Sequence, residues 1–284
     1  MSKILDWKAL VLASMTAMSP LSAAAIGSVT AADVTFGYTN NFTTSSTDTV
    51  DVAFTGAGTG DMAFESWWFY RVSGGSQESA FANPDIELYS GSVGRLDWVN
   101  PAGSGLFSAS LSFEVFDSGA NQGNLFQNLR IQNTSGSDLT IDIFHYSDLD
   151  LGGTAGNDRA ALGSNPDGIQ INLRDTTQTA PIVGYGANAY RVTQYAQLLQ
   201  DLTDVGVDDL ANTGLPLNNR DVTVGFQWSV TIAAGSARDF MTQFGSNAPL
   251  LDPTVTAIPE PGTAILMGLG LLMLAIPPRD ASAA

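Results

Sequence analysis

The stretch that decides the fold class is residues 221–233, which read DVTVGFQWSVTIA. Apolar side chains occupy every second position from Val222 to Ile232, and threonine, glycine, glutamine and serine fill the positions between them. Successive side chains of a β-strand point to opposite faces of the sheet. This period of two therefore predicts a strand with one buried face.

Shorter alternations of the same kind recur along the chain, separated by clusters of Gly, Ser, Thr, Asn and Asp that favour turns. Residues 125–134 and 139–144 are two such strands, and the turn between them makes either a hairpin or a connection between two sheets. One helix is expected near 195–202, where Tyr195, Leu198, Leu199 and Leu202 have helical spacing. Further strands are expected at 34–38, 49–54, 66–72, 86–90, 95–99, 106–116, 168–173 and 189–194.

These elements predict an all-β chain of about ten strands. The expected architecture is an antiparallel β-sandwich with one short covering helix, and a barrel is the alternative. No linker divides the body, so we expect one domain over residues 26–245. Prolines in the segment that follows favour a linker over 246–258.

The composition excludes several classes of function. The chain has 28 acidic residues against 11 Lys and Arg and a net charge of −17, which argues against nucleic acid as a partner. There is no cysteine, which excludes disulfides, thiolate catalysis and cysteine-ligated zinc. A single histidine excludes sites that need two.

The N-terminus has the order of a secretory signal. Lys3 and Lys8 give it a basic character, residues 9–18 are apolar, and small residues follow at 21–25. This order predicts a signal peptide over residues 1–25 with cleavage near Ala25, and hence export of the protein.

The C-terminus carries an apolar run at 263–276 that contains no charged residue. As a helix its 14 residues would span about 21 Å, which is short against a hydrocarbon core of about 30 Å. A buried core helix is therefore one interpretation. The run is apolar all round rather than amphipathic, which favours an apolar C-terminal helix in a membrane.

The motif Pro259-Glu260-Pro261, the apolar run and the basic residue Arg279 together resemble the PEP-CTERM sorting signal. The resemblance covers residues 259–284, and the chain departs from the family pattern in having one arginine where a cluster is usual. It implies a substrate of exosortases in Gram-negative bacteria that make exopolysaccharide. The implied partners are signal peptidase and an exosortase-like enzyme, with transient insertion in the inner membrane before release to the cell surface or exterior.

One loop offers ligands for a metal. Asp148, Asp150, Asn157 and Asp158 surround a glycine-rich stretch, and oxygen ligands of this kind suit Ca²⁺. The alternative is a solvated turn after a strand, in which Asp, Asn and Gly supply only local geometry. Calcium is the one cofactor that this sequence suggests.

Four aromatic residues follow one another in the expected strand at 66–72. Neighbours on a strand face opposite sides, so one pair is expected in the core. The rings of Trp67, Trp68 or Tyr70 could stack on sugars if the second face is open. The alternative is a strand covered on both faces.

The single histidine, His145, is in phase with Ile141 and Ile143 of the expected strand. It should therefore lie at the edge of the core. No G-x-S-x-G motif accompanies it, which argues against a Ser-His-Asp hydrolase.

The leading functional hypothesis is a non-enzymatic protein of the cell surface or extracellular matrix, associated with exopolysaccharide in a biofilm. The first alternative is a calcium-assisted carbohydrate-binding module that uses the aromatic strand or the 148–158 loop. The second is a secreted hydrolase with a catalytic carboxylate pair, although no spacing in the sequence singles out such a pair.

Overall fold

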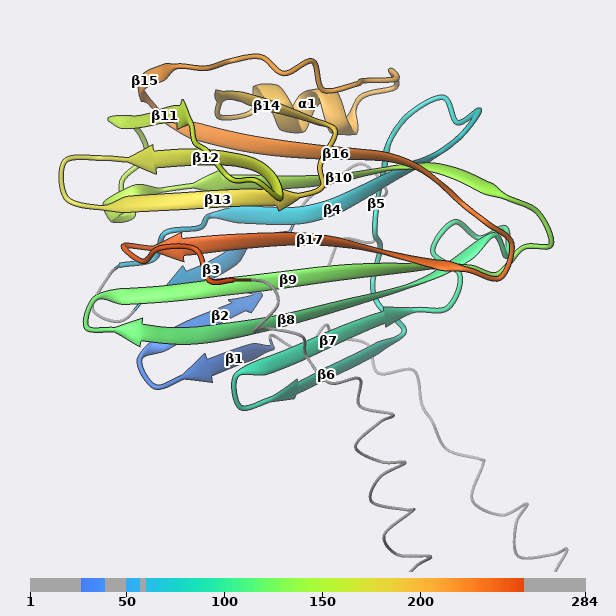
Figure 1. The fold of residues 1–284 in the computed structure, drawn as a ribbon, viewed down its shortest axis with the longest axis horizontal. Coiled ribbons are helices and arrows are strands. Elements are labelled where there is room, and N and C mark those ends of the chain that lie inside the picture. The colour runs from blue at the N-terminus through green and yellow to red at the C-terminus, as the bar shows by residue number, and fades with distance from the viewer. Residues whose placement is uncertain (1–26, 39–49, 57–59, 253–284) are drawn as a thin grey trace, which may run out of the picture. The chain divides into compact units, whose positions relative to one another are not determined.

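The computed structural model describes residues 27–38, 50–56 and 60–252 (Figure 1). In these residues the chain forms 17 β-strands, which pair antiparallel, and one α-helix. This confirms the expectation of a mostly β chain with antiparallel sheets and one helix. The number of strands was expected to be about ten and is therefore higher than the patterns indicated.

The largest sheet has nine strands and takes them from both halves of the chain (Figure 1). Its strands follow the spatial order β15 (Leu217–Arg220), β11 (Asp158–Leu162), β12 (Gly168–Arg174), β13 (Thr179–Tyr185), β17 (Ala237–Ser246), β9 (Gln122–Asn133), β8 (Phe107–Gly119), β7 (Val93–Trp98) and β6 (Ile86–Ser90).

Two smaller sheets complete the β structure. The five-stranded sheet has the order β14 (Ala189–Gln194), β16 (Val222–Ile232), β10 (Leu139–Leu149), β4 (Glu65–Val72) and β5 (Ser79–Ala80). The three-stranded sheet contains β1 (Ser28–Ala31), β2 (Val34–Tyr38) and β3 (Val52–Thr55). Helix α1 (Gln197–Thr203) follows β14, and a 3-10 turn at Leu151–Gly153 follows β10.

Strand β16 is the stretch with the strict alternation, and its apolar side chains are buried as expected except Val230, which is partly buried. Its second face is covered in the first half of the strand, where Thr223 and Gln227 are also buried, and is exposed at Ser229 and Thr231. Helix α1 lies against this second face. A Cβ atom at Gly225 would come within 2.8 Å of the Leu198 side chain, so the strand needs glycine where the helix crosses it. The sequence predicted that the apolar face of β16 is buried, but it did not predict that helix α1 covers part of the other face.

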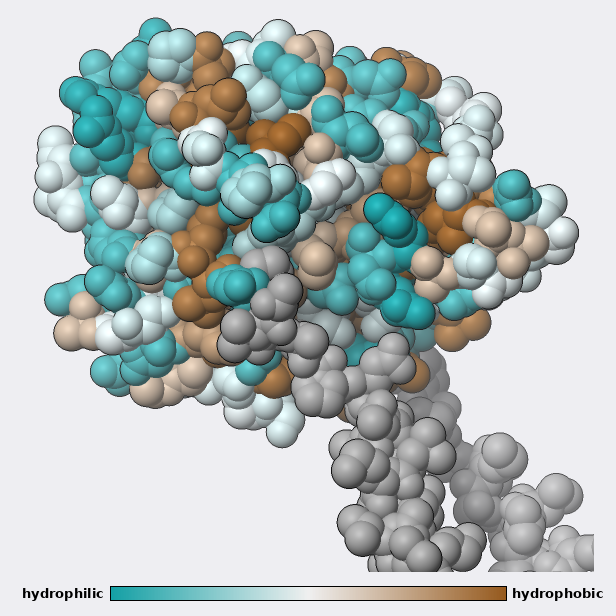
Figure 2. Space-filling view, in the orientation of Figure 1, coloured by the Kyte–Doolittle hydropathy of each residue, from teal (hydrophilic) through white to brown (hydrophobic). Residues whose placement is uncertain are grey.

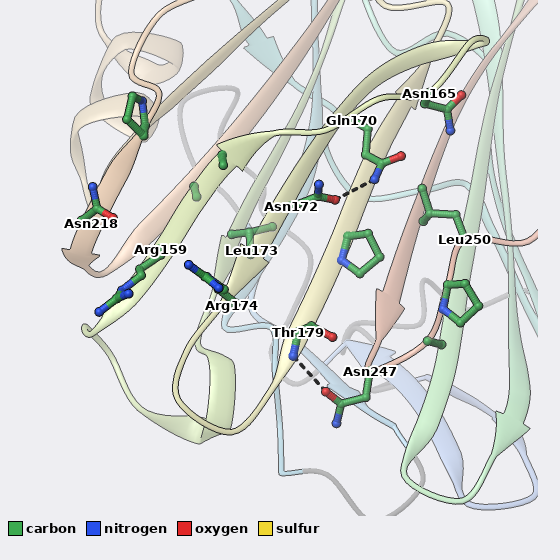
Figure 3. A pocket seen from close by; sticks show the side chains of 16 residues that line it. Arg159, Asn165, Gln170, Asn172, Leu173, Arg174, Thr179, Asn218, Asn247 and Leu250 are labelled. Carbon is green, nitrogen blue, oxygen red and sulfur yellow. Dashed lines mark hydrogen bonds between the residues drawn. The ribbon is translucent and has the colours of Figure 1, made fainter.

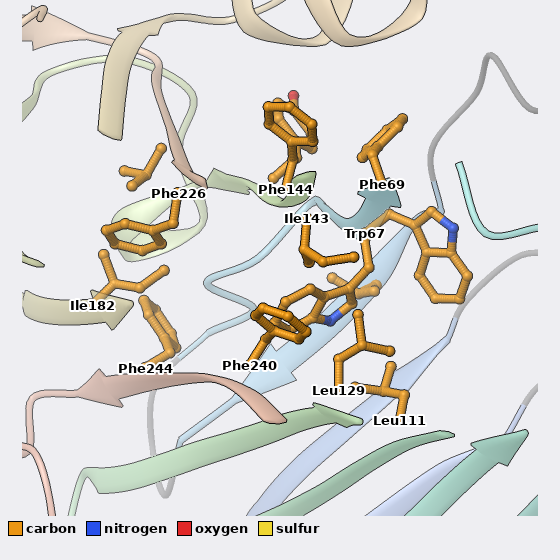
Figure 4. Close-up of a cluster of buried hydrophobic side chains, with 14 of the residues drawn as sticks. Trp67, Phe69, Leu111, Leu129, Ile143, Phe144, Ile182, Phe226, Phe240 and Phe244 are labelled. Atoms are coloured by element: carbon orange, nitrogen blue, oxygen red, sulfur yellow. The ribbon is translucent and has the colours of Figure 1, made fainter. Parts of the chain in front are cut away.

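The nine-stranded and five-stranded sheets share one hydrophobic core (Figure 4). Leu129 and Phe240 come from the larger sheet, and Ile143 and Phe226 come from the smaller one. Trp68 packs on His145 with ring centroids 4.5 Å apart. His145 is 2 % exposed, which confirms its expected position toward the core.

The connection from β9 to β10 joins the two large sheets, because β9 belongs to the larger sheet and β10 to the smaller one. Of the two expected connections, the one between sheets is therefore correct. Several strands of the nine-stranded sheet had no clear pattern in the sequence. Strand β13 contains Pro181 and Gly184, and β17 begins with charged residues, which weakens their alternation.

The two termini lie outside the described residues. This applies to the expected signal peptide (1–25), to Pro259, Glu260, Pro261 and Arg279, and to the expected apolar helix at 263–276. In the described part of the chain, none of the helical segments has the length and apolar character needed to cross a membrane. The start of the expected linker, residues 246–250, belongs to the compact unit that ends at Leu250.

Candidate functional site

A pocket with a volume of about 1000 Å³ lies on the nine-stranded sheet (Figure 3). Strand β12 alternates at this point, so Ile171 and Leu173 are buried in the core. Gln170, Asn172 and Arg174 take the other positions and line the pocket. The volume is at the upper end of the range in which ligand pockets usually fall.

Amide side chains make up much of the polar lining of this pocket. Gln170 donates a hydrogen bond from Nε2 to Oδ1 of Asn172 at 2.6 Å. Asn247 ties one wall to β13, because the Thr179 N–H donates to its Oδ1 at 2.9 Å and its own N–H donates to the Thr179 carbonyl at 2.8 Å (Figure 3). The wall is therefore held by two hydrogen bonds, while amides remain available to a ligand.

Two arginines stand at one end of the pocket, side by side in Figure 3. Arg159 of β11 and Arg174 of β12 are direct cross-strand partners, and both are exposed. Neither forms an ion pair with any residue that the structure describes. Like charges directly opposite each other weaken a strand pair, so the sheet itself gains nothing from this arrangement.

The residues expected to bind calcium are only partly brought together. Asp148 still belongs to β10 and is 2 % exposed, and Asp158 begins β11 and is fully buried. Asp150 lies between them at the start of the 3-10 turn. Asn157 is exposed with a φ of 70°, so it serves the turn rather than the buried group. The sequence did not single out Asp221, which precedes β16 and joins these acids.

Burial and neighbouring charges shift the protonation of these acids. Burial, followed by the charges of Asp221, Asp150 and Glu65, raises the pKa of Asp148 to about 8. The side-chain interaction between the two acids adds to the raised pKa of Asp148, whereas it opposes the effect of burial on the pKa of Asp221. Burial, with a smaller effect from Asp175 and Asp150, raises the pKa of Asp158 to about 7.

A second acidic group lies farther along the same strands and surrounds an arginine. Arg71 of β4 donates to Oδ2 of Asp142 on β10 at 2.7 Å, and it also pairs with Glu78 and Asp209 at 2.5 Å each. Its guanidinium lies 5.4 Å from the centre of the Phe144 ring. Since Glu78 is fully buried, this arginine neutralises a carboxylate that water cannot reach.

The aromatic strand leaves no ring open to a sugar. Trp67 and Trp68 are 1 % exposed, and Tyr70 is 8 % exposed. Trp67 packs edge-on against Tyr38 and Trp98, and its Nε1 donates to the carbonyl of Phe81 at 2.7 Å. The alternative interpretation, a strand covered on both faces, therefore describes these residues.

Comparisons with known proteins give a structural likeness only. No family model matches the sequence, and no curated protein matches it either. The crystal structure of a bacterial glucoamylase complexed with acarbose aligns with a TM-score of 0.50 and 11% identity, over 86% of this chain and 34% of that chain. A kojibiose phosphorylase candidate from the human microbiome covers similar shares with a TM-score of 0.37, which is too low to support a shared fold.

The glucoamylase likeness changes the functional interpretation. At 11% identity it shows the fold alone, and this chain spans about a third of the glucoamylase chain. A similar β fold therefore occurs in part of a bacterial glucoamylase. The expectation of a non-enzymatic protein of the cell surface or matrix is therefore wrong.

Proposed function

We propose that the β domain binds a carbohydrate that carries isolated anionic groups, and that the pocket around Arg159 and Arg174 is the binding site. The observation that carries the proposal is this pair of exposed, unpaired arginines in a pocket lined by amides. A planar guanidinium can hold a carboxylate or sulfate through two parallel hydrogen bonds, which a lysine cannot do.

Carbohydrate is the favoured class because amide side chains both donate and accept hydrogen bonds, as sugar hydroxyls require. The fold that this chain shares with part of a glucoamylase complexed with acarbose supports the same class. Since the pocket contains no aromatic side chain among its described lining residues, hydrogen bonds and charge would supply the affinity.

The charge of the whole chain limits the ligand further. A net charge of −17 repels a densely charged polymer at long range. Salt screens this repulsion beyond about 8 Å, whereas a group in direct contact with the two arginines still gains their attraction. The proposed ligand is therefore a glycan with scattered uronate or sulfate groups, in which single charges meet the pocket.

Calorimetry with two matched oligosaccharides tests this proposal. One contains uronate units, and the other has the same carboxylates reduced to alcohols. We expect the uronate form to bind at least tenfold more tightly in 0.15 M salt, because a charged hydrogen bond contributes about 1.5–3 kcal/mol. Arg159→Gln and Arg174→Gln should each remove this preference.

Arg238→Gln is the control, since Arg238 is an exposed arginine of the same sheet outside the pocket. Equal binding of the two oligosaccharides would refute the anionic part of the proposal, and binding that both pocket variants retain would refute the site. Chromatography of the incubated oligosaccharides would reveal any cleavage. A carboxylate-pair hydrolase finds no support in this pocket, because its described lining contains no acidic residue.

We also propose that the chain is exported and processed as its termini suggest, and that the two larger sheets form a β-sandwich. The support for export is the signal-like N-terminus and the resemblance of residues 259–284 to the PEP-CTERM signal. Mass spectrometry of the mature protein from its host tests it. A form that lacks residues 1–25 and those after about 261 is expected outside the cell, and an intact cytoplasmic form would refute it.

A further inference from the structure

We propose a calcium site where strand β10 ends, formed by Asp148, Asp150, Asp158 and Asp221. The strand register brings these residues together from three parts of the chain. Leu149 pairs with Val222, so Asp150 lies opposite Asp221 at the end of the β10–β16 ladder. The 3-10 turn at Leu151–Gly153 then returns the chain, and Asp158 begins the next strand.

The strongest observation is the state of the Asp158 carboxylate. The residue is fully buried, and neither of its oxygens has a hydrogen-bond partner among the residues that the structure describes. The Leu151 N–H lies near enough to lower the pKa of this group but does not form a regular hydrogen bond with it. A buried carboxylate without partners is costly, so native proteins pair such groups or place them on a cation.

Two neighbouring acids also have carboxylate oxygens without hydrogen bonds. Among the described residues, neither Oδ1 of Asp148 nor Oδ1 of Asp221 has a hydrogen-bond partner. No arginine of the described residues forms an ion pair with any of the four acids. The described part of the chain therefore supplies no positive charge to this group.

The donor set indicates which cation would fit. All four ligands offer oxygen, and His145, the one imidazole of the chain, packs on Trp68 in the core. Oxygen-only ligands with flexible spacing are typical of Ca²⁺, whereas Mg²⁺ requires a tighter octahedral geometry. No three acidic side chains of the described residues lie at metal-binding spacing in the structure. Binding would therefore require these carboxylates to turn toward one another.

Calcium titration of the purified full chain tests the site, with calorimetry and thermal unfolding as readouts. We expect one Ca²⁺ per chain, and at a hundredfold excess over its Kd an increase in Tm of about 5–10 °C relative to chelator. Asp158→Asn and Asp221→Asn should each abolish binding and the increase. Both changes keep the shape of the side chain, and Asp221 is only partly buried, so at least one variant should fold.

Asp138→Asn is the matched control, because Asp138 lies in an exposed turn away from the site. In chelator the two site variants should be at least as stable as the original chain, since each replaces one acid of a like-charged group with a neutral amide. An unchanged Tm between chelator and millimolar Ca²⁺, with no heat of binding, would overturn the proposal. So would calcium binding that both variants retain, or equally tight binding of Mg²⁺. These readouts need no glycan, so they are independent of the pocket around Arg159.

Discussion

The two ends of the β4–β10 strand pair differ in whether an arginine lies beside the acidic side chains. At one end Arg71 stands opposite Asp142, and at the other end Glu65 stands opposite Asp148. Both pairs lie on the face of the sheet that turns away from His145, at equivalent positions of one antiparallel ladder. The first pair joins opposite charges across the strands and the second joins like charges.

The protonation equilibria follow this difference. Burial alone would lower the pKa of Arg71, but hydrogen bonds with Asp209 and Asp142 outweigh it and hold that pKa above its usual value. The hydrogen bond from Arg71 lowers the pKa of Asp209. At the other end the pKa of Asp148 is raised to about 8. Arg71 thus favours the ionised form of Asp209, whereas at Glu78 the effect of burial outweighs that of the arginine and raises the pKa. At the other end no arginine opposes the effect of burial on Asp148.

This comparison shows that burial does not by itself determine how an acidic group behaves. Glu78 and Asp158 are both fully buried, but only Glu78 contacts an arginine. Arg71 supplies a positive charge to the acids around it. We propose that a Ca²⁺ ion taken up from the solvent supplies the positive charge to Asp158 and its neighbouring acids.

Arg71→Met should have the largest effect on stability. It leaves Glu78 buried without its partner, and breaking a buried ion pair in this way costs about 3–5 kcal/mol of unfolding free energy. Urea denaturation measures this loss. Arg238→Met, at an exposed site, should change stability by no more than about 0.5 kcal/mol. A loss below about 1 kcal/mol for Arg71→Met would mean that the arginine does not stabilise this end.

His145→Gln should alter the pH dependence of stability. Burial lowers the pKa of His145 to about 3, while the unfolded chain titrates near 6.5. The unfolded state thus binds the proton first, so this contribution is complete above about pH 6.5 and is lost as pH falls toward 3. The loss should reach about 2 kcal/mol at pH 5 in the original chain and be absent from the variant.

Denaturation curves of the original chain and of His145→Gln, each at pH 7 and pH 5, isolate the contribution of His145. The contribution of the acidic residues is the same in both and cancels in the comparison. The groups around the ring are uncharged, since Ser66 contacts its Nε2 at 3.3 Å and the ring of Trp68 packs against it at a steep angle. Parallel pH profiles for the two chains would show that His145 does not resist protonation in the fold.

Asp148→Asn changes the end of the strand pair that has no arginine. Its effect on the free energy of unfolding should not be a loss like that expected for Arg71→Met. In chelator the substitution replaces a buried carboxyl group, whose ionised form is disfavoured by burial and by neighbouring acids, with a neutral amide. We therefore expect unchanged stability or a gain of about 1 kcal/mol in the free energy of unfolding, within the range of optimised surface or buried charges. Urea denaturation in the presence of chelator measures it. A loss comparable to that of Arg71→Met would mean that this carboxylate already has a partner.

Arg159→Gln should have the smallest effect on stability. It removes one of two like charges that stand opposite each other, which should leave stability unchanged or raise it by about 0.2–1 kcal/mol. Glycan binding should fall in the same variant, as proposed above. A clear loss of stability on thermal unfolding would instead indicate that the arginine supports the sheet.

Local patterns predicted the strands whose two faces differ in polarity. The alternation from Val222 to Ile232 predicted β16, and the phase of His145 predicted its position toward the core. Strands β11 and β13 had no such signal, because β11 is short and begins with two charged residues and β13 contains a proline. The pocket on these strands could therefore not be recognised from the sequence.

The sequence by itself determined the all-β class, the excess of negative charge and the exclusion of thiol chemistry. Each of these depends only on residue type or on spacing within one strand. The tertiary structure alone decided that Asp221 joins Asp148 and that Arg159 faces Arg174. Such neighbours come from separate segments, and the order of strands in a sheet determines them. That order depends on the packing of the whole chain, which no local pattern contains.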